Sequence, residues 1–361
     1  MPPLTGRERI ARILRREPVD RIGLFESFWG DTRKKWIAEG HVRADEDLPT
    51  HFGFDISTHW PFNLMADLGF EPVVVEETAE TILTRDANGA LLRRHKLHDA
   101  TPEHVDFAVK DRRTWEAKAR SLLLEPDRRR IDFEGYRRAR REAAEAGRFF
   151  CWGGRNVFEL IFPVCGHEHM LMGMALDPAW VRDMVDVYAE LTVALMGILF
   201  AEEGPPDGVW FFEDMGFKGR PFMSPQMYRD IVQPGHARTF AWAHSWGLPV
   251  LVHSCGYIRP LLPGLVEAGM DCLQVMEVKA GMDPLEIKAE FGDRITLFGG
   301  MDARNLVAND REAIRRELGR KIPVLMEGGG YILHSDHSVP TTCDYETYRF
   351  FVDEGLRLGT Y

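Results

Sequence analysis

The chain has 361 residues, a length that fits either two average domains or one closed α/β barrel. Its 45% hydrophobic and 28% charged residues are typical of a globular protein with a large core, and they exclude a disordered or collagen-like chain. The formal net charge of −11 disfavours contact with phosphate backbones and anionic lipid surfaces. We therefore expect neither a nucleic acid nor a membrane as a partner.

The N-terminal segment and the cysteines indicate a cellular compartment. Residues 1–18 are charged throughout and lack the apolar core and cleavage site of a signal peptide. The longest mostly apolar stretch, 191–201, is shorter than the ~20 residues that a bilayer requires, so it predicts a buried helix segment. The cysteines are dispersed, odd in number and free of CxxC pairs, which disfavours a disulfide framework. The sequence therefore predicts a reduced, cytoplasmic protein.

The first predicted elements are a helix and two short strands. Thr5 and Glu8 have the spacing of a capping box and precede apolar residues at helical spacing. A short strand is predicted over 21–25, and a weaker one near 52–57. These elements come before any segment with a regular strand–helix alternation.

Residues 72–95 predict an insertion. Two β-branched runs, VVVEETAETILTR and ALLRRH, flank residues 86–89, whose sequence DANG is a strong hairpin-turn signal. We expect a β-hairpin there. Residues 111–148 follow, rich in Arg and Glu; because both signs are interleaved, we expect solvated helices rather than a ligand patch.

From residue 149 onward, short apolar runs alternate with longer segments of helical pattern, which predicts parallel strands covered by helices. The runs are residues 149–152, 208–212, 248–252, 272–275, 295–298 and 330–333. With the two earlier strands the count is about eight, the number that closes a (β/α)8 barrel of the TIM type. A GxGxxG motif is missing, which disfavours an open doubly wound sheet. No linker marks a second domain, so we predict one barrel domain over residues 1–361.

Polar side chains follow these predicted strands, at the end where a barrel carries its catalytic groups. Such a cluster is costly to bury unless a cation or a polar substrate satisfies it. The residues are Glu213, Asp214, His253, Ser254, Cys255, Glu277, Asp302, His334, Ser335, Asp336 and His337.

His253 and Cys255 are the sharpest signal in this set. Residues i and i+2 of a strand point to the same side, so the imidazole and the thiol would face the barrel mouth together. Catalytic zinc uses three protein ligands and keeps a fourth position open. We predict zinc on His253 and Cys255, with His337 as the third ligand and Glu277 as a labile fourth. Alternatives for the third position are His334, Asp336 and Cys343. A packed histidine beside a buried cysteine is the competing interpretation.

Four segments resemble the uroporphyrinogen decarboxylase superfamily, specifically its cobamide-dependent methyltransferase branch. They are DGVWFFEDMGFKGRPFMSPQMYRDIVQP, LPVLVHSCGYIRPLLPGLVEAGMDCLQV, FGDRITLFGGMDARNLV and GGGYILHSDHSVP. The resemblance implies a distorted (β/α)8 barrel with its cleft at the C-terminal mouth. It also implies zinc held by a His-x-Cys pair and a last-strand cysteine. His253 and Cys255 match that pair, and His337 stands where the cysteine is expected.

The resemblance also distinguishes between two activities. Decarboxylases of the superfamily carry an arginine-bearing RQAGRY-type motif after the first strand, whereas this chain has FESFWG at residues 25–30, including the acidic Glu26. An acidic and aromatic entry disfavours a multiply anionic porphyrinogen. The resemblance therefore implies a zinc-dependent methyltransferase that moves a methyl group between a small thiol, ether or amine and a corrinoid. Because the chain lacks a DxHxxG corrinoid motif, we expect a separate protein to carry the corrinoid.

The remaining candidate residues are assigned either catalytic or substrate-binding roles. The expected catalytic residues are Glu277, Asp302 and Asp336, and the expected substrate contacts are Glu26, Trp60, Glu213 and Asp214. The alternative is a cofactor-free decarboxylase or lyase acting on a non-porphyrin carboxylate, with His337 and Asp302 in proton transfer. A non-catalytic partner of a corrinoid protein is a third possibility. Metal analysis separates the first two.

Overall fold

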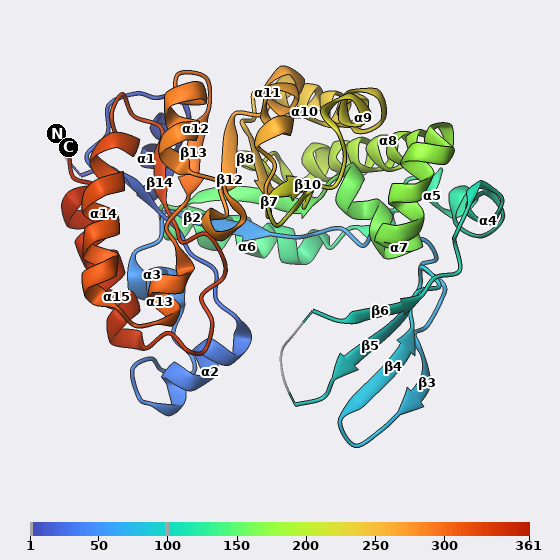
Figure 1. Ribbon diagram of the computed structural model, residues 1–361, viewed down its shortest axis with the longest axis horizontal. Coiled ribbons are helices and arrows are strands. Elements are labelled where there is room, and N and C mark those ends of the chain that lie inside the picture. Colours follow the sequence, from blue (N-terminus) through green and yellow to red (C-terminus); the bar gives the residue numbers. More distant parts are fainter. Residues whose placement is uncertain (1–2, 98–100) are drawn as a thin grey trace.

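The computed structural model describes residues 3–97 and 101–361. Within these ranges, eight parallel strands form a nearly closed barrel in the hydrogen-bonded order β1-β14-β13-β12-β11-β8-β7-β2 (Figure 1). The barrel strands are β1 (Gly23–Leu24), β2 (Ile56–His59), β7 (Phe149–Arg155), β8 (Gly208–Phe212), β11 (Val250–Ser254), β12 (Cys272–Val275), β13 (Thr296–Gly299) and β14 (Tyr331–Leu333). This arrangement confirms the predicted TIM-type barrel.

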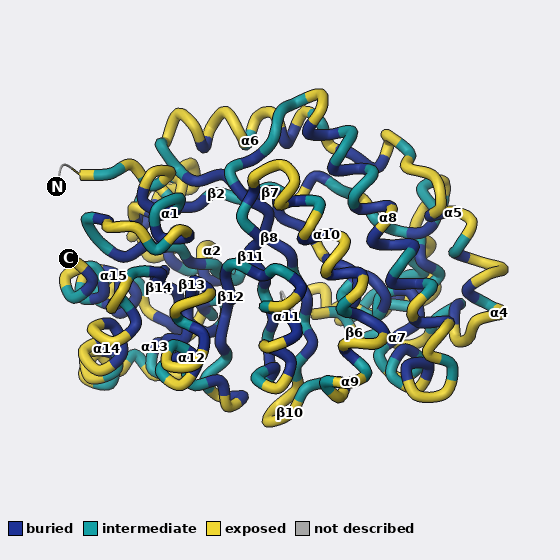
Figure 2. Tube along the Cα trace, turned by 90° about the horizontal axis from the view of Figure 1, so that it is seen from above, coloured by how far each residue is buried: buried dark blue, intermediate teal, exposed yellow. Residues whose placement is uncertain are grey.

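Helices surround the barrel with their outer faces exposed, while the strands inside are buried (Figure 2). The longer helices are α2 (Gly30–Ala38), α6 (Phe133–Glu145), α7 (Val157–Leu176), α8 (Pro178–Glu203), α10 (Gln233–Ser245), α11 (Leu262–Ala268), α12 (Pro284–Phe291), α14 (Arg311–Leu325) and α15 (Tyr345–Leu358). Shorter helices are α3 (Leu48–Phe52), α4 (Arg112–Trp115), α5 (Ser121–Leu123), α9 (Pro225–Met227) and α13 (Ala303–Val307).

Helix α8 contains the longest apolar stretch of the chain. It is the one helix in the described ranges that is long and apolar enough to cross a membrane by length and composition. However, 61% of its most apolar window is buried inside the protein. This burial is what a core helix requires, and it agrees with the predicted buried segment at 191–201.

Helix α1 (Gly6–Leu14) closes the end of the barrel at which the strands begin. Its predicted capping box is present: the Thr5 side chain accepts from the Glu8 backbone, and the Glu8 side chain accepts from Thr5 N. Its apolar face, Ile10, Ile13 and Leu14, is buried in the barrel interior. The same cluster contains Ile56, Phe149, Cys151, Trp210, Leu251, Cys272, Phe298 and Ile332. Because α1 fills this end, the opposite, C-terminal end is left for a site.

A buried carboxylate joins the two edge strands of the barrel sheet, β1 and β2. Asp55 N donates to Leu24 O at 2.8 Å, and Asp55 Oδ2 accepts from Leu24 N at 2.8 Å. Arg9 and Arg21 pair with the same carboxylate at 2.6 and 2.8 Å. These contacts span the seam where the ladder of strand pairs is interrupted.

The insertion is larger than the predicted hairpin. It is a four-stranded antiparallel sheet that stands apart from the barrel in Figure 1. Its strands are β3 (Val73–Glu77), β4 (Thr81–Arg85), β5 (Leu91–His95) and β6 (Glu103–Asp106). The predicted turn at 86–89 joins β4 to β5 as expected, but the prediction of one long strand before this turn was wrong. Thr78 N donates to Thr81 O at 2.9 Å, and this turn splits the run into β3 and β4.

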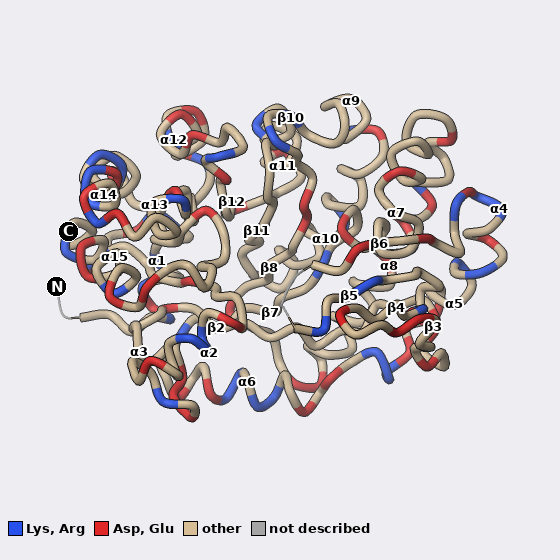
Figure 3. Tube along the Cα trace, turned by 60° about the horizontal axis from the view of Figure 1, so that its bottom comes forward, with Lys and Arg blue, Asp and Glu red and all other residues tan. Residues whose placement is uncertain are grey.

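The charged segment 111–148 forms helices, as predicted. Arg and Glu residues are interspersed along α6, which lies on the outside of the molecule (Figure 3). Arg137 pairs with Glu203, and Arg120 pairs with Asp183 at 2.8 Å, so cations of this segment find anions on α8. The charges therefore attach the segment to the barrel.

Candidate metal centre and substrate cavity

Asp214, His253 and Cys255 form the centre of the candidate site. In residues 3–97 and 101–361, they are the one group of three His, Cys, Asp or Glu side chains whose ligand atoms all lie within 4.8 Å of one another. His253 lies on β11 and Cys255 directly follows that strand, while Asp214 follows the neighbouring strand β8. Two adjacent strand ends therefore supply nitrogen, sulfur and oxygen donors at the C-terminal mouth.

The separations within this group fit a zinc ion. His253 Nε2 lies 3.3 Å from Asp214 Oδ1 and 3.4 Å from Cys255 Sγ. Ligand atoms on a tetrahedral zinc, each ~2.0–2.3 Å from the ion, are about 3.3–3.8 Å from one another. Both measured separations are those of neighbouring zinc ligands, and the mixed donor set is one that zinc accepts.

The orientation of the His253 ring is fixed by its other nitrogen. His253 Nδ1 contacts Oε1 of the buried Gln274 on β12, and the ring of Phe212 stacks on it with centroids 4.6 Å apart. Because an amide oxygen only accepts, Nδ1 carries the proton and Nε2 faces the other two ligands. This is the outer contact that a metal-binding histidine needs.

Charge coupling within the centre is strong. Burial lowers the pKa of His253, but Cys255 and Asp214 outweigh burial and hold that pKa well above its usual value. Burial raises the pKa of the Cys255 thiol, and His253 opposes this rise. In the absence of a cation, His253 is therefore protonated and pairs with Asp214, so a bound cation replaces a proton.

Backbone amides hold the two carboxylates that flank Cys255. Cys255 N donates to Asp214 Oδ1 at 2.7 Å, and Gly256 N donates to Glu277 Oε2 at 2.7 Å. Glu277 also lies 3.2 Å from Lys279 and lines the same cavity as Asp214 and Cys255. The loop after β11 thus orients a carboxylate on each side of the thiol.

Glu159 is a site residue that the sequence analysis missed. It lies in the first turn of α7, lines the cavity and accepts from Asp214 N at 3.2 Å. Burial, with repulsion from Asp214 and Glu213, raises its pKa to about 9, so the carboxyl keeps its proton at neutral pH. β7 ends at Arg155, three residues beyond its predicted end, which places this turn at the mouth.

Three other predicted acids brace the mouth through backbone or helix contacts. The oxygens of Glu213 accept from Phe158 N and Glu159 N at 3.0 and 2.7 Å, and His236 lies 2.7 Å away. The Asp336 oxygens accept from Val278 N and Ala303 N, both at 2.8 Å. Asp302 caps α13 and pairs with Arg304 at 2.6 Å. Glu213 and Asp336 thus connect neighbouring strand ends, whereas Asp302 stabilises the start of the helix that follows its own strand.

The predicted ligands of the last strand lie outside the group of three. The ring of His337 faces Trp29 with centroids 6.3 Å apart, and Cys343 Sγ lies 3.6 Å from Asp344 O. The third member of the group is Asp214, which the sequence analysis assigned to substrate. The sequence signal for Asp214 is an acid two residues after β8, and it does not distinguish Asp214 from the neighbouring Glu213.

His334 and Glu26 form a separate buried pair between β14 and β1. His334 Nε2 lies 3.0 Å from Glu26 Oε1, and Ser335 N and Ser27 N donate to the Glu26 carboxyl. Burial raises the pKa of Glu26 to about 8 and lowers the pKa of His334 to about 3. Both side chains are therefore uncharged at neutral pH.

A cavity of about 980 Å³ lies over the centre. Asp214, Cys255, Glu159 and Glu277 line it on the barrel side, and His104 of β6 lines it from the insertion. Its cationic lining residues are Arg155, Lys218, Lys279 and Arg304. The inserted sheet thus forms part of the wall of the site.

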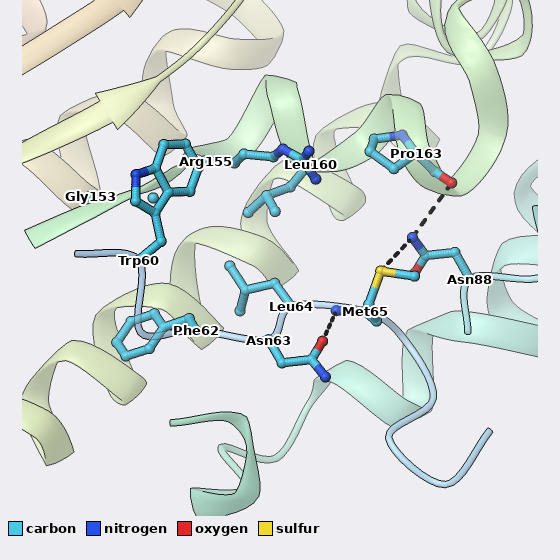
Figure 4. A pocket seen from close by; sticks show the side chains of 11 residues that line it. Trp60, Phe62, Asn63, Leu64, Met65, Asn88, Gly153, Arg155, Leu160 and Pro163 are labelled. Carbon is cyan, nitrogen blue, oxygen red and sulfur yellow. Dashed lines mark hydrogen bonds between the residues drawn. The ribbon is translucent and has the colours of Figure 1, made fainter. Parts of the chain in front are cut away.

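A second cavity, of about 250 Å³, lies next to the first and shares Arg155 with it (Figure 4). Trp60, a predicted substrate contact, lines this smaller cavity and not the larger one. The candidate site therefore has a larger chamber with several charged lining residues over the centre and a smaller chamber beside it.

Comparison with known proteins finds methyltransferases and decarboxylases that resemble this chain. A curated methylated-thiol–coenzyme M methyltransferase of Methanosarcina mazei is 27% identical over 152 residues, 41% of this chain and 38% of that protein. A uroporphyrinogen decarboxylase of Streptomyces avermitilis is 27% identical over 182 residues, 50% of this chain and 48% of that protein. The matched regions thus span less than half of either curated relative.

A solved methyltransferase structure from Methanosarcina mazei has the same fold, with a TM-score of 0.65 and 14% identity over 98% of both chains. The sequence pattern of the Uroporphyrinogen decarboxylase (URO-D) family matches residues 158–356, more than half of the chain. The matched region begins in α7 and includes Asp214, His253 and Cys255. The chain belongs to the uroporphyrinogen decarboxylase family.

Proposed function

We propose that this protein is a zinc-dependent methyltransferase that moves a methyl group between a small molecule and a corrinoid carried by a separate protein. The observation that carries the proposal is the nitrogen, oxygen and sulfur donor group of His253, Asp214 and Cys255, in which His253 Nε2 lies 3.3 and 3.4 Å from the other two donors, as neighbouring zinc ligands do. The curated methyltransferase relative and the shared fold support the same reaction class.

The chain's own residues divide the work of the site. A zinc ion bound by Asp214, His253 and Cys255 would supply Lewis acidity that lowers the pKa of a thiol or hydroxyl, or withdraws charge from an ether oxygen. Gln274 keeps His253 Nε2 directed at the centre, and the Cys255 amide holds Asp214. This outer support preserves the ligand geometry while substrates exchange.

Glu159 supplies the proton. Its carboxyl is protonated at neutral pH, lines the cavity and lies against the Asp214 backbone. When a methyl group leaves an oxygen, sulfur or nitrogen atom, that atom takes the Glu159 proton; in the reverse direction, the Glu159 carboxylate accepts the proton of the acceptor.

The environment of the cysteines supports a reducing compartment. All five cysteines are free thiols, and Cys151, Cys165, Cys272 and Cys343 are buried. We place the protein in the cytoplasm, where thiols stay reduced and where a corrinoid protein would meet it.

Metal analysis tests the proposal. We expect about one zinc per chain in the purified protein and loss of most of it in His253→Ala and Cys255→Ser, because each removes one of three protein ligands. Cys343→Ser is the matched control, since this buried cysteine lies outside the donor group. Zinc-loaded protein mixed with a methyl donor and a reduced corrinoid protein should change the cobalt absorption spectrum.

Two results would contradict the proposal. One is a purified protein that contains no zinc and binds none on titration. The other is a zinc-loaded protein that leaves the cobalt spectrum unchanged across thiols, ethers and amines. In the first case, release of carbon dioxide from small carboxylates by the metal-free protein would support the decarboxylase alternative.

A further inference from the structure

The 250 Å³ cavity beside the metal centre is lined mainly by carbon. Its walls combine aromatic and aliphatic side chains from the loop after β2 with the N-terminal part of α7, as Figure 4 shows. The apolar lining residues are Trp60, Phe62, Leu64, Met65, Leu160 and Pro163. An apolar cavity of ~150 Å³ already accommodates benzene, so this one has room for a six-membered ring with a substituent.

Two aromatic contacts connect this cavity to the metal centre. The ring of Trp60 lies 4.5 Å from the ring of Phe212, and the ring of Phe212 lies 4.6 Å from that of His253, measured between centroids. The two cavities share Arg155, and Leu160 of the small cavity directly follows Glu159 of the large one. An aromatic ring bound in the small cavity would therefore lie beside both Glu159 and the metal centre.

The inserted sheet holds this cavity in shape. Asn88, in the turn between β4 and β5, is buried; its Oδ1 accepts from Ala66 N at 2.8 Å, and its Nδ2 donates to Pro163 O at 3.5 Å. The turn thus joins the loop after β2 to α7. A cavity built before the ligand arrives costs little to order on binding.

The glycine at position 153 makes room for the indole ring of Trp60. A Cβ atom added at Gly153 of β7 would lie 2.7 Å from Trp60 Nε1 and 2.6 Å from Thr58 Oγ1. Only glycine lets the indole lie this close to the strand. The chain therefore keeps a flat aromatic surface at the cavity, and such surfaces favour offset or edge-on contact with another ring.

We propose that the small cavity binds the aromatic ring of the methyl substrate, so that the substrate class is aryl methyl ethers and thioethers. This inference rests on the proposed methyl transfer. The ring lies against Trp60, and its methylated oxygen or sulfur reaches past Arg155 into the large cavity. The bond between the methyl carbon and that atom breaks, and the electron pair of a cob(I) corrinoid forms the new bond to the methyl carbon. The released oxygen or sulfur takes up a proton and leaves as a phenol or thiophenol.

Equilibrium binding to the zinc-loaded protein without corrinoid tests the ring site apart from turnover. The probes are 2-methoxyphenol and, as a small alkyl donor, methanol, followed by calorimetry or tryptophan fluorescence. We expect 2-methoxyphenol to bind at least about tenfold more tightly, and Trp60→Ala to weaken its binding by about tenfold through loss of the ring contact. Trp60→Phe should restore most of the affinity. Trp246→Ala is the matched control, because Trp246 is 40% exposed at the end of α10, packs on Phe200 and Trp242, and lies outside both cavities.

The outcomes separate the ring site from the reaction. Equal binding of the two probes, or unchanged 2-methoxyphenol binding in Trp60→Ala, overturns the ring site. If the protein transfers a methyl group from methanol but does not bind the aromatic ring, the proposed function stands and this inference is overturned. Trp60-dependent ring binding by a protein that transfers no methyl group supports the ring site and contradicts the proposed function.

Discussion

His253 Nε2 lies 3.4 Å from Cys255 Sγ, whereas Ser254 between them points away and accepts from Met215 N at 3.1 Å through its Oγ. The alternation of strand side chains thus brings two donors together on the mouth side of β11 and uses the middle residue to tie down the loop after β8. That loop carries Asp214, so the contact at Ser254 helps place the third donor.

Gln274→Ala should weaken zinc binding by about 10- to 100-fold, the usual cost of losing an outer contact of a metal-binding histidine. The amide oxygen of Gln274 fixes the His253 ring from the side away from the centre. Competition with a chelator measures the affinity. Gln226→Ala is the control, since this exposed residue bonds only to Asp230 and Arg229 in the described contacts. Equal zinc affinities for the two variants would show that Gln274 has no such role.

Asp214→Ala and His337→Ala distinguish the two candidates for the third ligand. We expect Asp214→Ala to lower zinc affinity by at least about 100-fold, because it removes a donor that lies 3.3 Å from His253 Nε2. His337→Ala should change the affinity by less than about threefold, because His337 lies outside the donor group. The reverse order would restore the last strand as the source of the third ligand.

Glu159→Gln should lower kcat by about 10²- to 10⁴-fold and leave the zinc content unchanged, because the variant removes a proton donor and no ligand. Burial raises the pKa of Glu159 to about 9, so methyl removal should proceed at a constant rate up to that pH and slow above it. A pH–rate profile of the wild type checks this. A wild-type rate that does not fall above pH 9, or a fully active variant, would exclude Glu159 as the donor.

The sequence predicts the barrel well because fully buried strands leave a clear pattern. The apolar runs at 208–212 and 272–275 coincide with β8 and β12, and the packed face of α1 is predicted by helical spacing. The pairing of His253 with Cys255 is also local, since it depends only on the two-residue period of one strand. Features that depend on one element are therefore readable from the chain.

The rest of the site depends on contacts between distant segments. Asp214 joins the centre because the Cys255 amide holds it, and Glu159 enters because β7 continues through two glycines to Arg155. Neither contact follows from a repeating spacing of residues in the sequence. The ring-sized cavity likewise requires Asn88 to meet Pro163, 75 residues later in the chain. Such pairings set the chemistry and the substrate shape, and only coordinates reveal them.

Glu26→Gln should remove a pH-dependent loss of stability. Burial raises the pKa of Glu26 from 4.5 to about 8, so between these values the folded chain keeps a proton that the unfolded chain has released. The folding free energy of the wild type therefore weakens as pH rises through this window, by about 1.4 kcal/mol per pH unit from this group. Glutamine is uncharged like the protonated acid: its oxygen accepts from Ser335 N and its amide faces His334. The amide cannot accept from Ser27 N, but that loss does not vary with pH.

Urea unfolding at pH 5, 6, 7 and 8 measures the effect as a difference between variant and wild type, which cancels contributions from the other titrating groups. The variant's advantage should grow steadily from pH 5 to pH 8 and then level off, because above the folded pKa both states of the wild type have lost the proton. Glu103→Gln is the control, since the side chain of Glu103 is 63% exposed on β6. A difference that does not vary with pH would mean that Glu26 is ionised in the folded protein, held as a charged pair with His334.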